Sequence, residues 1–117
     1  MSAVRLAMSA AMASALIASA ALAGPAVATR YTVPDRWKNA PATQEACLSR
    51  AEAAILDTGF IEIERTDQTR YGTMREYTAA VRCIMDKAIV VIIVSGPSRQ
   101  TADRGAGALF QNFEAGR

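Results

Sequence analysis

Two glutamates have a spacing that could support acid–base chemistry. Glu62 and Glu64 are separated by one residue in the stretch FIEIERT, and on a β-strand they would project from the same side, about 6 to 7 Å apart. Glycosidases use paired carboxylates near that separation. Alternating glutamates are also typical of a strand whose outer side faces water, and we favour this interpretation. A small hydrolase or lyase that uses Glu62, Glu64, Glu76 or Tyr71 is the alternative.

The segment VVIIVSGPSRQ has the outline of a strand, a loop and a helix that together bind phosphate. It lacks the GxxxxGKS/T and GxGxxG signatures, and Pro97 removes one of the backbone amides that such a loop supplies. The sequence contains no histidine, which removes the usual general base and the commonest zinc ligand. We therefore predict no enzymatic activity, no cofactor and no metal, and we interpret the segment as a turn from a strand into a helix.

The chain has two cysteines, Cys47 and Cys83, which lack the CxxC spacing of redox-active pairs. In an oxidising compartment two thiols pair by default, so we predict a structural disulfide between them. A free reactive thiol and a metal-binding pair are the alternatives. In a small domain such a cross-link would add roughly 4 kcal/mol according to the loop-entropy model.

The first 23 residues predict export. Arg5 is followed by an uncharged stretch, residues 6–23, that ends in the small-x-small pattern Ala21-Leu22-Ala23. This is the layout of a secretory signal peptide. We place the cleavage after Ala23, with Ala28 as the second choice. An uncleaved anchor is the alternative, but the stretch is mostly Ala and Ser, so its insertion into a bilayer is weakly favoured.

Export predicts a periplasmic or secreted protein that has no membrane contact after cleavage. The charges do not support a nucleic-acid partner, because the 13 Lys and Arg are nearly balanced by 11 Asp and Glu and form no basic stripe.

The mature chain is predicted to form one domain, residues 43–117, preceded by an irregular arm, residues 24–42. The arm contains three prolines and no hydrophobic period. We expect its Trp37 to cover the core rather than to bind a ligand. In the domain, Thr43 can cap a helix that Gly59 would end, so the first helix is expected over residues 43–58.

Three strands and a second helix are expected after this helix. Residues 60–66 and 76–84 alternate in hydrophobicity, residues 88–94 are apolar on both sides, and Ser98 can cap the last helix. DQTRYG, residues 67–72, is interpreted as a loop. The predicted fold is an α+β two-layer sandwich, α-β-β-β-α, in which a three-stranded antiparallel meander carries both helices on one face.

The other face of this sheet is the predicted interaction surface. Glu62, Glu64 and Arg82 should lie there beside one apolar row of the last strand. That row is either Ile89, Val91 and Ile93 or Val90, Ile92 and Val94, and we assign the second row to the surface. As the last strand of the meander, this strand could also pair with its copy in a second molecule.

Several structural motifs resemble a known group of proteins. They are a first helix that carries a cysteine, Gly59-Phe60 before the first strand, the strand YTAAVRC, and a VV-rich strand that ends in Gly96-Pro97. This combination is similar to a group of small secreted Gram-negative bacterial proteins of unknown function, and the similarity covers residues 44–114. The resemblance implies the predicted order of elements and the bridge between Cys47 and Cys83, and it implies no catalytic residue.

We therefore expect a disulfide-stabilised binding module, and its partner would be an unknown envelope protein or a second copy of the chain. An inhibitor or immunity-type protein that acts on an envelope enzyme through the loop at residues 67–72 is the alternative from a different class.

Overall fold

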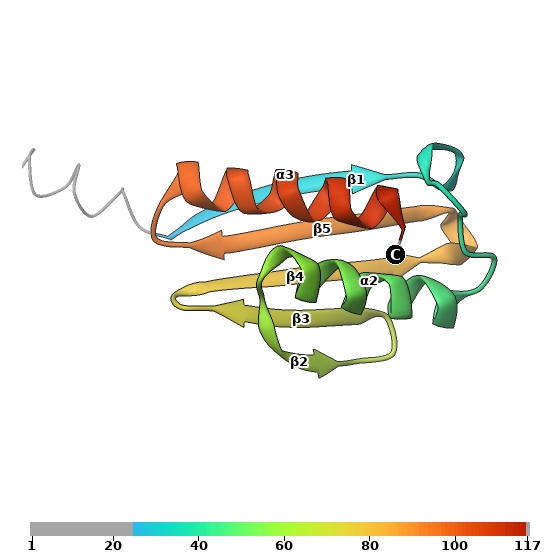
Figure 1. Ribbon diagram of the computed structural model, residues 1–117, viewed down its shortest axis with the longest axis horizontal. Coiled ribbons are helices and arrows are strands. Elements are labelled where there is room, and N and C mark those ends of the chain that lie inside the picture. Colours follow the sequence, from blue (N-terminus) through green and yellow to red (C-terminus); the bar gives the residue numbers. More distant parts are fainter. Residues whose placement is uncertain (1–24, 117) are drawn as a thin grey trace, which may run out of the picture.

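The computed structural model describes residues 25–116, which form a five-stranded antiparallel sheet and two α-helices (Figure 1). The predicted signal peptide, residues 1–23, lies outside the described residues. Along the chain the elements are β1 (Ala26–Thr32), the 3-10 helix η1 (Pro34–Arg36), α2 (Gln44–Thr58), β2 (Ile61–Arg65), β3 (Thr69–Met74), β4 (Tyr77–Ile84), the 3-10 helix η2 (Met85–Lys87), β5 (Ile89–Gly96) and α3 (Arg99–Ala115). The predicted α+β class is confirmed.

The strands lie in the order β1-β5-β4-β3-β2. Strands β2 to β5 form a meander, and β1 pairs with β5 at the far edge. The chain therefore crosses from one edge of the sheet to the other between β1 and β2, and α2 lies on this connection. The prediction that β5 is an edge strand is wrong, because β1 covers its outer side.

Two strands were not predicted. The arm is not irregular throughout, because its residues Ala26–Thr32 form β1, and residues 69–72 of the expected loop belong to β3. The β2–β3 turn is short, since the backbone N–H of Thr66 donates to the carbonyl of Thr69 at 3.0 Å. Both segments contain Thr and Tyr, which are frequent in strands, and pairing with a neighbouring strand stabilises them.

Both helices begin, and α2 also ends, where local signals predicted. The Thr43 hydroxyl accepts the backbone N–H of Ala46 at 3.1 Å, and Gly59 ends α2 at a φ of 104°, a left-handed conformation that favours glycine. The Ser98 hydroxyl accepts the N–H of Thr101 at 3.3 Å and caps α3 in the same way.

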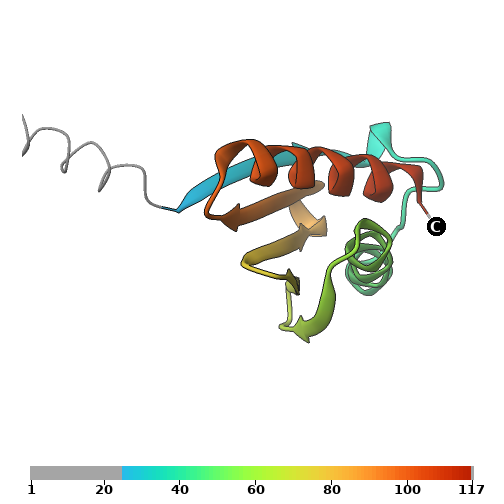
Figure 2. The ribbon, with the colours of Figure 1, turned by 60° about the vertical axis from the view of Figure 1, so that its left-hand side comes forward.

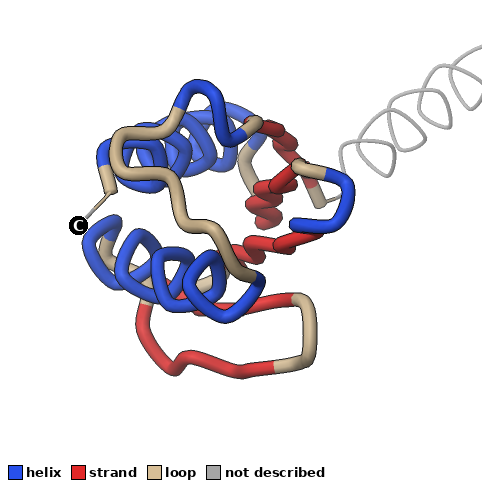
Figure 3. The backbone as a smooth tube through the Cα atoms, turned by 90° about the vertical axis from the view of Figure 1, so that its right-hand side faces the viewer, coloured by secondary structure: helices blue, strands red, loops and turns tan. Residues whose placement is uncertain are grey.

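Both helices pack on the same face of the sheet (Figures 2 and 3). Helix α3 lies over β1 and β5, and α2 lies over β3 and β4 beside α3. The core between the layers contains the largest fully buried side chains, which are Phe60, Phe113, Ile55, Ile92, Leu109, Val81, Val90 and Val94. The second face of the sheet has no helix over it among the described residues.

The predicted disulfide is confirmed. Cys47 of α2 and Cys83 of β4 are bonded, with their Cα atoms 6.2 Å apart. Both residues are 0% exposed, so the bond lies inside the core and joins the helix layer to the sheet. Cys83 faces the helices together with Ala79 and Val81, as their alternation predicted.

Trp37 covers one end of the core, as expected. It is 6% exposed and meets the ring of Phe113 edge to face, with the ring centroids 4.9 Å apart. Its indole N–H donates to the hydroxyl of Thr32 at 2.8 Å, and this hydroxyl in turn donates to the carboxylate of Glu114. The end of β1, the segment that follows it and the end of α3 are therefore connected by hydrogen bonds.

No helix within residues 25–116 combines the length and the apolar character that crossing a membrane requires.

Candidate functional site

The open face of the sheet, opposite the helices, is the candidate functional site. The assignment of Val90, Ile92 and Val94 to this face is wrong, because these side chains are at most 1% exposed and belong to the core. Both rows of β5 are apolar. Alternation therefore places the two rows on opposite faces of the sheet but does not show which row is buried. The two helices decide it by covering the row that contains Ile92.

The other row of β5, formed by Ile89, Val91 and Ile93, therefore lies on the open face, where each side chain is partly exposed. It occupies the middle of the sheet, between β1 and β4. Strand β4 adds Ala80 and Ile84, opposite Ile93 and Ile89 respectively. These five residues form the apolar centre of the open face.

Two tyrosines flank this apolar centre. Tyr31 of β1 lies opposite Val91 and is 70% exposed. On the other side, Tyr71 of β3 lies opposite Ala80 and is partly exposed. Tyrosines combine a large apolar surface with a polar hydroxyl and are frequent in protein interfaces.

Charged and polar side chains border the apolar centre. Arg82 lies opposite Val91 and is exposed, and its guanidinium donates to the side-chain carbonyl of Gln68 at 2.5 Å. Glu64 lies opposite Tyr71, toward the β2 edge. The open face therefore has an apolar middle, a cation near its centre line and acids at one edge.

The two glutamates lie on a distorted edge strand. Between the pairs Ile61–Thr73 and Glu64–Tyr71 the register shifts by one residue, and Glu62 adopts a φ of 58°. This β-bulge interrupts the alternation that the sequence predicted. Ile61 therefore lies 58% exposed instead of sharing the side of Ile63, which packs against the core.

This position gives the glutamates no catalytic surroundings. Both are exposed on β2, and Glu62 accepts only a long hydrogen bond, 3.4 Å, from the hydroxyl of Thr73. Water therefore reaches both carboxylates freely. A glycosidase places its two carboxyl groups on either side of the bond that it breaks, whereas Glu62 and Glu64 lie together on one exposed edge strand.

The turn after β5 is occupied by protein groups. The backbone N–H of Ser98 donates to the hydroxyl of Tyr77 at 3.1 Å, and the ring of Tyr77 fills the space where Gly96 would carry a Cβ. Pro97 has no N–H to offer. These groups support the interpretation of this segment as a turn between a strand and a helix.

The segment at residues 67–72 does not project as a loop. Only Asp67 and Gln68 of this segment lie in the β2–β3 turn, and the other residues are paired in β3. Within residues 25–116, no cluster of three or more Cys, Asp or Glu side chains is arranged to hold a metal ion.

A scan against models of protein families found no match, and searches of curated proteins and of solved structures found none either.

Proposed function

We propose that this protein is an exported, disulfide-stabilised binding module that uses the open face of its sheet to bind another protein. The observation that carries the proposal is the uncovered apolar centre of this face, which a tyrosine flanks on each side. Contiguous apolar groups with a polar border mark sites of protein contact more often than ordinary surface.

The composition of the open face indicates the kind of partner. Protein interfaces have an apolar centre enriched in aromatic residues, surrounded by a polar rim. Val91 and Ile93 would supply the centre, Arg82 a cation beside it, and Glu64 the rim. A complementary partner surface would be apolar, with an acidic group opposite Arg82 and a basic group opposite Glu64.

The disulfide supports the exported location. Structural disulfides form and persist in oxidising compartments such as the bacterial periplasm. The bond between Cys47 and Cys83 ties α2 to β4, and β4 is one of the strands that display the open face. The cross-link would hold this surface in shape without the help of a partner.

Affinity capture with matched variants tests the proposal. The protein would be expressed from its full sequence, purified as the cell processes it, and used to capture proteins from periplasmic extract. Ile93→Lys places a charge in the apolar centre and should abolish capture of the specific partner. Leu56→Lys is the matched control, because Leu56 is an equally apolar residue of α2 that is 52% exposed, and it should capture the partner normally.

A partner that binds both variants equally would contradict the proposal. Reversing the charge beside the apolar centre provides an independent check, since Arg82→Glu should weaken binding most at low ionic strength, where charge pairs are least screened. Circular dichroism of each variant establishes that the fold is intact.

A further inference from the structure

The two edges of the sheet differ in how they resist pairing with another strand. Strand β2 has five residues, of which Glu62, Glu64 and Arg65 are charged, and a bulge interrupts its register. Short length, charge and bulges are the features with which proteins block edge-to-edge association. The β2 edge is therefore protected.

The β1 edge is less protected. Its seven residues pair with β5 without a register shift and contain one charged residue, Arg30. Val27 and Tyr31, two of the large apolar side chains that are more than half exposed, lie on it. A regular edge strand with exposed apolar side chains is a template for a further strand.

The ladder pattern shows which β1 groups face the free edge. The N–H of Cys83 donates toward β3, to the carbonyl of Gln68 at 2.8 Å. Because successive residues of an antiparallel strand point to alternate neighbours, Ala80 points toward β5, and its partner Ile93 points back toward β4. Thr29 lies opposite Ile93, so its N–H and C=O point away from β5.

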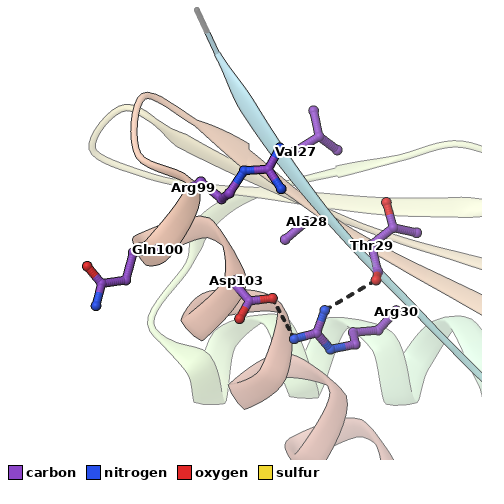
Figure 4. A pocket seen from close by; sticks show the side chains of 7 residues that line it. All are labelled: Val27, Ala28, Thr29, Arg30, Arg99, Gln100 and Asp103. Atoms are coloured by element: carbon purple, nitrogen blue, oxygen red, sulfur yellow. Dashed lines mark hydrogen bonds and ion pairs between the residues drawn. The ribbon is translucent and has the colours of Figure 1, made fainter. Parts of the chain in front are cut away.

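A side-chain contact agrees with this assignment. The carbonyl of Thr29 accepts a hydrogen bond from the guanidinium of its neighbour Arg30 at 3.3 Å (Figure 4), as expected of a carbonyl that has no strand beside it. By the same alternation, the backbone N–H and C=O groups of Val27 and Tyr31 also face the free edge.

We propose that β1 pairs antiparallel with β1 of a second copy, so that two sheets join into one continuous sheet. Thr29 is the middle residue of Ala26–Thr32, and a twofold axis beside it pairs every residue of the strand. Val27 would then face Tyr31 of the second copy, and each outward pair would exchange two backbone hydrogen bonds. β-Branched residues and aromatic residues form favourable cross-strand pairs.

Neighbouring registers are less favourable. An axis beside Arg30 would place the two Arg30 side chains opposite each other, and like charges in that position destabilise a strand pair. An axis beside Ala28 would leave Tyr31 without a cross-strand partner. The register centred on Thr29 avoids both problems.

A groove beside β1 accommodates the side chain that this register brings in. The groove has a volume of about 680 Å³ and lies between β1 and the first turns of α3 (Figure 4). Arg30 of the second copy would lie opposite Ala28, whose methyl group leaves the groove open. The carboxylate of Asp103, which pairs with Arg30 of its own chain at 2.7 Å, is 58% exposed there and can also face the incoming cation.

Sedimentation across a range of protein concentrations tests the proposal, again with the protein expressed from its full sequence. The wild type should form a dimer at high concentration. Thr29→Pro should be monomeric, because proline removes an outward N–H that β5 does not use, and proline is tolerated on the open side of an edge strand. Thr29→Ser keeps this N–H and should dimerise as the wild type does.

Charge pairs at positions 27 and 31 test the register. Val27→Lys with Tyr31→Lys brings lysines together and should be monomeric, whereas Val27→Lys with Tyr31→Glu forms two opposite-charge pairs and should dimerise at low salt. Both double variants lose the same apolar side chains, so their difference reports only the pairing.

A wild type that stays monomeric up to its solubility limit, or a dimer that survives Thr29→Pro, would overturn the proposal. Double variants that behave alike would overturn the register. The inference does not rest on the proposed function. Ile93 lies on β5, opposite Thr29, but Ile93→Lys alters none of the outward β1 groups that form the new pairing, so it should leave the dimer intact.

Discussion

The guanidinium of Arg50 donates from Nε to the backbone carbonyl of Phe113 at 2.6 Å. Its other nitrogens donate to the carbonyls of Lys38, Asn39 and Glu114 at 2.7 to 2.9 Å. Arg50 is 8% exposed. Burial lowers the pKa of Arg50 and the nearby Glu114 carboxylate raises it, but a guanidinium stays protonated at neutral pH. One side chain of α2 thus fixes both the end of α3 and the segment before α2.

Replacing Arg50 by methionine should therefore lower the free energy of unfolding by roughly 3 kcal/mol, because carbonyls buried by the fold would lose charged donors. Urea unfolding followed by the fluorescence of Trp37 measures this free energy. Trp37 reports on the region around Arg50, because the Arg50 guanidinium lies 5.8 Å from the centre of its ring. Arg104→Met, at an exposed position of α3, is the control and should change stability little. A loss below about 1 kcal/mol for Arg50→Met would show that water replaces these hydrogen bonds.

Removal of the disulfide should destabilise the protein without unfolding it at neutral pH and room temperature. The bond joins cysteines 36 positions apart, for which loop entropy gives up to about 4 kcal/mol. The double variant Cys47→Ala and Cys83→Ala should show this loss in urea unfolding. Because both cysteines are fully buried, the wild-type bond should resist dithiothreitol until urea opens the core. Rapid reduction under native conditions would contradict this burial.

Acid should remove the contribution of Glu52. Its carboxylate accepts hydrogen bonds from Arg65 at 2.5 Å and from Arg70 at 2.9 Å, and the hydrogen bond from Arg65 is the main cause that lowers the pKa of Glu52 below 4.5. Since the folded carboxyl group binds its proton less readily than the unfolded one, it stabilises the fold above about pH 4.5 and loses this effect as the pH falls through the folded pKa.

Glu52→Gln should accordingly cost up to about 1 kcal/mol at pH 7, and this cost should shrink in acid. Stability measured by urea unfolding at several pH values checks the trend. The same substitution in a chain that carries Arg65→Met and Arg70→Met is the control, because the partners of Glu52 are then absent and the pH-dependent difference should disappear. A cost that grows on acidification would have the wrong sign.

Two glycines should respond in opposite ways to alanine. A Cβ at Gly72 would lie 2.5 Å from Cγ2 of Ile55 and 3.0 Å from Cβ of Phe60, so Gly72→Ala should cost roughly 1 to 3 kcal/mol. A Cβ at Gly107 of α3 would meet nothing within 4 Å, so Gly107→Ala should add up to about 1 kcal/mol of helix stability. Both substitutions lower the conformational entropy of the unfolded chain by a similar amount. Opposite shifts in melting temperature would therefore reflect the difference in packing around the two glycines in the folded protein.

Signal cleavage should leave Gly24 as the first residue. Cleavage after Ala28 would remove the first three residues of β1, among them Ala28, which is 7% exposed and lies opposite Val94. Cleavage after Ala23 leaves the whole strand. Intact-mass measurement of the processed protein distinguishes these products, and a chain that begins at Thr29 would show that β1 is shorter in the mature protein.

The sequence alone determined the features that depend on near neighbours or on composition. Thr43, Gly59 and Ser98 mark helix ends because a cap is a hydrogen bond or a backbone conformation within a few residues. The disulfide follows from composition, since two cysteines allow one intramolecular bridge. The alternation of YTAAVRC placed Cys83 on the helix side because side chains of a strand alternate strictly.

Only the tertiary structure decided the edges of the sheet and the identity of the open face. Strand β1 gains its hydrogen bonds from β5, a segment far away in the sequence, so its place at the edge of the sheet does not follow from its own residues. The bulge at Glu62 arises from the register with β3. On β5 both rows are apolar. Val90, Ile92 and Val94 are buried because the helices cover their side of the sheet. Ile89, Val91 and Ile93 therefore lie on the open face.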